Sequence, residues 1–196
     1  MSAETGDSPH RALQAAAVAA DAAAQRHLLA GDEARAEPFL RESERLYRES
    51  WEVAPPGGYG RLVGMLKAAI LLRDAAGAAA YARAALTAED DSPTAAYALA
   101  LASLAAGDDD AAAEAAGRVA TGGEAFARTA RALAALAQRD EAAYAAGLAD
   151  VIADFELRDL HLTGVAIADT ALALERLADP RGLAQRPSSA VLPPPV

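Results

Sequence analysis

The sequence predicts an all-α protein. Of its 196 residues 58 are alanine, so most of the 53% hydrophobic content comes from the residue with the highest intrinsic helix propensity. Only 3 isoleucines and 8 valines are present, and no stretch alternates apolar and polar residues with period two. Because strands depend on β-branched residues in such an alternation, the composition argues against a sizeable sheet.

The first four expected helices cover about residues 9–30, 32–54, 59–73 and 75–88. Gly31 ends the first, and Asp32 begins the second because its side chain can accept hydrogen bonds from free N–H groups of the first turn. Pro38, in the first turns of the second helix, marks an alternative start. The run of two prolines and two glycines at 55–58 ends that helix.

Five more helices are expected at about 92–106, 108–120, 123–138, 140–155 and 159–179. Ser92 followed by Pro93, and Asp108 after Gly107, mark two of the starts. Residues 9–179 are therefore expected to form a single repeat-like helical domain. The polar segment 1–8 is expected to be disordered, and the proline-rich tail 180–196 to be extended, with packing favoured through Leu183, Val191 and Leu192.

A unit of two helices recurs with a period near 34 residues. Four times an apolar helix end runs into a short turn that contains an aspartate, at Asp32, Asp74, Asp108 and Asp140. Within the chain, residues of about 59–155 resemble the tetratricopeptide-repeat family. The similarity is best over 94–120, where small residues fall at the positions at which the two helices of such a repeat touch. The resemblance implies a right-handed array of about nine helices, stacked as antiparallel hairpins, whose concave surface binds another polypeptide.

The C-terminal stretch has a second resemblance. Residues 166–177, Arg181-Gly182-Leu183 and the tail 192–195 are similar to the final helix and tail of all-helical bacterial immunity proteins of polymorphic toxin systems. This implies a toxin as partner. The high alanine content and the 17 arginines beside a single lysine are typical of a GC-rich bacterial genome.

The charge balance excludes some function classes. A net charge of −10 without any basic segment argues against nucleic-acid binding, which needs a concentrated positive surface, and favours a partner with a basic surface. No targeting sequence or membrane-spanning segment is recognisable, so a cytoplasmic location without membrane contact is expected.

Motifs for catalysis and metal binding are not recognisable. The chain has no cysteine, no phosphate-binding glycine loop and no Gly-x-Ser-x-Gly motif, so no cofactor, metal or catalytic residue is predicted and catalysis is disfavoured. The acidic runs 89–91 and 108–110 are assigned to helix N-termini. His161 lies near several carboxylates, and it is expected at the start of the last helix with Asp159 as the cap.

The sequence predicts a non-catalytic protein-binding module, such as an immunity or adaptor protein. Aromatic and arginine side chains dominate many interfaces, although Trp51 is favoured as a core residue. The candidate contact residues are Tyr47, Trp51, Tyr59, Lys67, Tyr97, Arg128 and Arg131. One alternative is a small-molecule-binding or catalytic bundle with a pocket near Tyr97, Tyr144 or His161, and another is a homo-oligomer.

Overall fold

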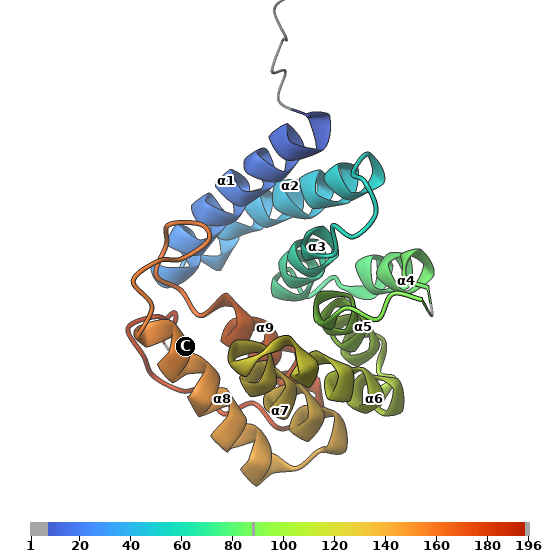
Figure 1. Ribbon diagram of the computed structural model, residues 1–196. Coiled ribbons are helices and arrows are strands. Elements are labelled where there is room, and N and C mark those ends of the chain that lie inside the picture. The colour runs from blue at the N-terminus through green and yellow to red at the C-terminus, as the bar shows by residue number, and fades with distance from the viewer. Residues whose placement is uncertain (1–7, 88, 195–196) are drawn as a thin grey trace, which may run out of the picture.

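The computed structural model describes residues 8–87 and 89–194, which form nine α-helices and no β-strand (Figure 1). The all-α prediction is confirmed. The expectation that residues 1–8 are disordered lies outside the described residues, except for Ser8. The helices are α1 (Pro9–Leu29), α2 (Glu33–Glu52), α3 (Gly60–Leu71), α4 (Ala76–Ala85), α5 (Pro93–Ala106), α6 (Asp109–Val119), α7 (Glu124–Gln138), α8 (Glu141–Glu156) and α9 (Asp169–Ala178), with short 3-10 turns at Ala120–Gly122 and Asp179–Arg181.

The four turns predicted from the repeat share one backbone geometry. In each, the residue before the aspartate is left-handed, and the aspartate N–H donates to the carbonyl five residues earlier, which satisfies the end of the preceding helix. The left-handed residues are Gly31, Arg73, Gly107 and Arg139. The carboxylates of Asp32, Asp108 and Asp140 then cap α2, α6 and α8. Asp74 does not cap, because α4 begins later, after Ala75.

These turns produce four helix hairpins, α1–α2, α3–α4, α5–α6 and α7–α8, which follow a curve around α9 (Figure 1). Alanine and glycine at the contacts let the helices approach closely. At Gly147 of α8, an added Cβ would lie 3.0 Å from the backbone of Ala132 in α7. Leucines and Tyr144 fill the space between the hairpins and α9.

The expected start of the last helix at residue 159 is wrong. Residues 157–168 form a loop that returns to the first hairpin, where Val165 and Ile167 are buried against α1 and α2. Gly164 is left-handed at φ 71°, which interrupts a helix. Neither Asp159 nor His161 begins a helix, since the N-cap of α9 is Ala168. Burial of the two β-branched side chains outweighs the local helix propensity of this segment.

The C-terminal tail packs along the helices. Leu183, Val191 and Leu192 are buried, and the Ala168 N–H donates to the Val191 carbonyl at 2.8 Å. Within the described part of the chain, no helix is both long and apolar enough to cross a membrane.

Candidate functional site

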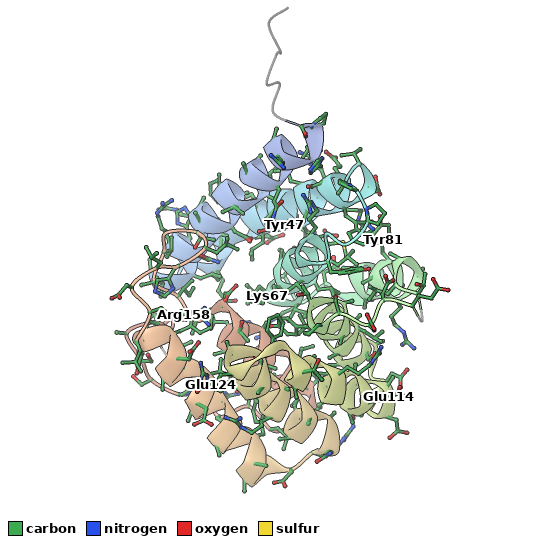
Figure 2. All side chains as sticks on the ribbon, viewed as in Figure 1. Tyr47, Lys67, Tyr81, Glu114, Glu124 and Arg158 are labelled. Atoms are coloured by element: carbon green, nitrogen blue, oxygen red, sulfur yellow. The ribbon has the colours of Figure 1, made fainter. Side chains whose placement is uncertain are left out.

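A cavity of about 280 Å³ lies inside the curve of hairpins, close to the lower end of the size range of small-molecule sites. Its walls come from α1, α2, α3, α5, α7, α8, the loop 157–168 and the first turn of α9. In Figure 2, Tyr47 and Lys67 lie near the middle of the molecule, between α2, α3 and α9, and Arg158 lies at the end of α8. Five residues named from the sequence line this cavity: Tyr47, Lys67, Tyr97, Arg128 and His161.

Lys67, the only lysine of the chain, joins α3 to α9 inside the cavity. Its Nζ donates to Asp169 Oδ2 at 3.0 Å and to Thr170 Oγ1 at 2.8 Å, and it lies 5.8 Å from the centre of the Tyr97 ring. Burial opposes the charge, but the attraction of Asp169 outweighs it and raises the pKa of Lys67. Lys67 therefore stays an ammonium ion.

Asp21 of α1 lies beside this pair and is bonded only to hydroxyl groups. Its carboxylate accepts from Ser43 Oγ at 2.6 Å and from the Tyr47 hydroxyl at 3.1 Å. Loss of hydration raises the pKa of Asp21 to about 6, despite these two hydrogen bonds. Gly64 of α3 makes the contact with Tyr47 feasible, because an added Cβ would lie 2.5 Å from the tyrosine ring.

The other end of the cavity is basic and aromatic. Arg128 of α7 and Arg158 of the loop that follows α8 both donate to Asp154, the latter from Nε at 3.0 Å. The guanidinium of Arg158 lies 3.8 Å over the ring of Phe155, and the His161 ring is 6.1 Å from Phe155. Two guanidinium groups thus share one partly buried carboxylate at this end.

Three buried polar atoms of the cavity residues have no hydrogen-bond partner: the Tyr97 hydroxyl, Arg128 Nε and His161 Nδ1. Tyr97 is only 8% exposed. A buried polar group without a partner costs about 1–3 kcal/mol, so such groups are scarce in folded proteins. Three further buried atoms of the described chain without a partner, Arg48 Nε, Ser103 Oγ and Arg118 Nε, belong to residues outside the cavity, so half of these atoms gather around this one space.

The remaining predicted residues lie elsewhere. Trp51 and Tyr59 pack on each other, with ring centres 5.7 Å apart, and both are half-buried at the edge of the core. Arg131 is exposed and pairs with Asp150 at 2.9 Å. Tyr144 is fully buried, donates to Glu175 at 2.7 Å, and is not among the residues that line the cavity.

The acidic runs have structural roles in the described chain. Asp108 caps α6, and Asp109 pairs with Arg181 of the tail and with Arg139. Asp90 accepts from Tyr59 and from Thr87 rather than capping α5, which Ser92 caps. Between residues 8 and 194, Ala88 aside, no three His, Asp or Glu side chains gather closely enough to hold a metal ion.

Sequence reasoning placed Asp154 near His161 but missed other residues of the cavity, above all Asp21, Asp169 and Phe126. Asp21 had a signal, since it is the one charge within the alanine-rich run 15–24. Asp169 had no such signal in the sequence, because the last helix was expected to begin at residue 159 and Asp169 therefore fell in its middle and not in its first turn.

The chain matches no protein-family model, no curated protein and no solved structure. The similarities to tetratricopeptide repeats and to immunity proteins therefore rest on the residues quoted for them.

Proposed function

We propose that the protein binds a small organic molecule in the cavity between the hairpins and α9. The observation that carries the proposal is the set of three unpartnered buried atoms, on Tyr97, Arg128 and His161, around one apolar-walled space. Binding sites of this kind combine an apolar lining with a few convergent polar groups. The desolvated Asp21 and the Lys67–Asp169 pair add charged groups of both signs.

The position of α9 favours a small ligand over a polypeptide. A peptide bound along the inner face of the hairpins would have to displace α9, which is tied to α3 by Lys67–Asp169 and to α8 by Tyr144–Glu175. Residues of α9 such as Leu174 are fully buried in the main core. The cavity that remains is small, so its occupant is expected to be a small molecule.

A fragment screen followed by NMR tests this proposal. We expect binding fragments to shift the amide signals of Lys67, Tyr97 and Thr170. Ala125→Trp places a large ring at an exposed position of the cavity wall and should block binding, whereas Ala142→Trp, on an exposed part of α8 away from the cavity, should not. Fragments that bind both variants equally, or that leave the cavity signals unchanged, would contradict the proposal.

A second proposal, protein binding, is favoured by the loop that follows α8. Leu157, Leu160 and Leu162 are 84%, 88% and 83% exposed, which is unusual for three leucines within six residues. Glu156 and Asp159 lie next to them, and the chain carries a net charge of −10. The partner expected here is a protein with an apolar groove and a basic rim, as proposed for an adaptor or immunity role.

Protein binding is tested by retention from lysate at low and moderate salt, with wild type and with the double variant Leu157→Ser and Leu160→Ser. We expect one stoichiometric partner that is weakened by salt and lost with the variant. A partner retained equally by the variant would contradict this use of the loop. If the bait retains only further copies of this protein from the lysate, the result would instead indicate a homo-oligomer.

A further inference from the structure

The charges at the inner end of the cavity do not balance. Two carboxylates, Asp21 and Asp169, face one ammonium, Lys67, whose hydrogen bonds go to Asp169 and Thr170. Asp21 takes part in none of the ion pairs formed by the described residues; its partners are the neutral hydroxyls of Ser43 and Tyr47. With both carboxylates ionised, this end carries one uncompensated negative charge.

A partly buried carboxylate without an ion-pair partner is stabilised by a proton or by a cation. Burial, and to a smaller extent the nearby charge of Asp169, raise the pKa of Asp21 to about 6, although the hydrogen bonds from Ser43 and Tyr47 and the charge of Lys67 act in the opposite direction. At neutral pH the proton is mostly lost and the carboxylate stays desolvated. A ligand that brings one positive charge to Asp21 removes this cost.

The surroundings fit an organic cation. Aromatic rings of Tyr47, Tyr97, Phe126 and Phe155 line the same cavity, together with Val63, Val151, Val165 and Ile167. Aromatic faces attract cations, and the apolar side chains can bury a hydrocarbon group. The hydroxyl of Tyr97, one of these rings, has no hydrogen-bond partner and can accept from an N–H group. A metal ion does not fit, since no three carboxylate or imidazole groups of the described chain gather around one point.

We propose that the cavity binds a small organic amine with an apolar group, its ammonium at Asp21 and its apolar group against the rings of Phe126 and Phe155. This inference rests on the proposed function and names the chemical class of the ligand. The small volume of the cavity, about 280 Å³, limits the ligand to a compact amine.

Three probes of matched shape test the inference: 2-phenylethylamine, 2-phenylethanol and 3-phenylpropionate. Their affinities are measured by NMR titration of wild type, Asp21→Asn and Asp150→Asn, the last being an exposed aspartate on α8. We expect wild type and Asp150→Asn to bind the amine about tenfold or more tightly than the alcohol, and Asp21→Asn to bind the two alike. Amine affinity should also fall from about pH 8 to about pH 5, as Asp21 takes up a proton, while alcohol affinity stays constant.

The outcomes separate this inference from the proposed function. If the alcohol or the carboxylate binds at the cavity as tightly as the amine, the amine class is overturned while small-molecule binding stands. The same holds if Asp21→Asn keeps the preference for the amine. If no probe and no fragment from the screen shifts the cavity signals at millimolar concentration, both proposals fall.

Discussion

Replacement of Asp21 by asparagine is expected to stabilise the protein at neutral pH. The change removes the negative charge and keeps the shape of the side chain. The amide oxygen can accept from Ser43, and the amide N–H can donate to the Tyr47 oxygen, so both neighbours of the carboxylate keep a hydrogen-bond partner. The main effect is therefore the loss of a desolvated charge.

The magnitude follows from the pKa of Asp21, which is about 6 in the folded protein against an ordinary value of 3.8. This difference corresponds to about 3 kcal/mol. Because the folded state binds the proton more tightly than the unfolded state, wild type loses stability as the pH rises from about 4 to about 6. The penalty is absent below that window and complete above it, and the asparagine variant has no such penalty.

Urea unfolding of wild type and Asp21→Asn at about pH 4.5 and about pH 7.5 measures this effect. We expect the variant to be more stable than wild type by about 1–3 kcal/mol at the higher pH; the gain can fall below the full penalty because neutral hydrogen bonds replace charge-assisted ones. At the lower pH most of this difference should disappear, because Asp21 of wild type is then largely protonated. Comparison at each pH cancels the titration of the other carboxylates, and the exposed Asp150→Asn serves as control. An equal difference at both pH values would refute the argument that Asp21 is desolvated.

Three further substitutions test the packing. Lys67→Met should destabilise the protein by about 2–4 kcal/mol in urea unfolding, because it leaves Asp169 charged and unpaired, and the added change Asp169→Asn should restore part of the loss. Gly147→Ala should cost about 1–3 kcal/mol because its Cβ would meet backbone at 3.0 Å, whereas Gly117→Ala, with nothing within 4 Å, should stabilise by about 0.5–1 kcal/mol. Trp51→Ala should cost about 2–3 kcal/mol, less than a fully buried tryptophan, since the ring is half-buried; an unchanged melting temperature would show that it adds no packing.

The hairpins could be predicted from the sequence because their turns are local. Gly31 and Gly107 adopt the left-handed conformation that ends a helix, and the aspartate after each caps the next helix. The start of α9 could not be predicted in this way. It depends on the docking of Val165 and Ile167 against the first hairpin, a contact between distant parts of the chain that no local pattern encodes.

The cavity depends on the same distant contacts. Asp21 comes from the first helix and Asp169 from the last, and they meet at Lys67 only because the loop 157–168 returns the chain to its beginning. The sequence pointed to Lys67 and Tyr97 as residues that could contact a partner. It also indicated a pocket near Tyr97 or His161 as an alternative, but it could not indicate that Lys67 would line the same cavity.

The composition also explains why a cavity exists in so closely packed a protein. Alanine-rich helices approach one another closely, and the chain has only nine aromatic residues. Four of these line the cavity, Tyr47, Tyr97, Phe126 and Phe155, so much of its aromatic side-chain volume surrounds one space instead of filling it.

The residues of the cavity include a largely buried carboxylate without an ion-pair partner and three buried polar atoms without hydrogen-bond partners, features that lower the stability of the fold. An amine bound at Asp21 should therefore raise the melting temperature more at about pH 7.5 than at about pH 5, because protonation of Asp21 competes with the ligand. An uncharged ligand of the same shape should raise it equally at both. The pH dependence of ligand-induced stabilisation thus distinguishes a site built around the charge of Asp21 from a cavity that only accommodates an apolar group.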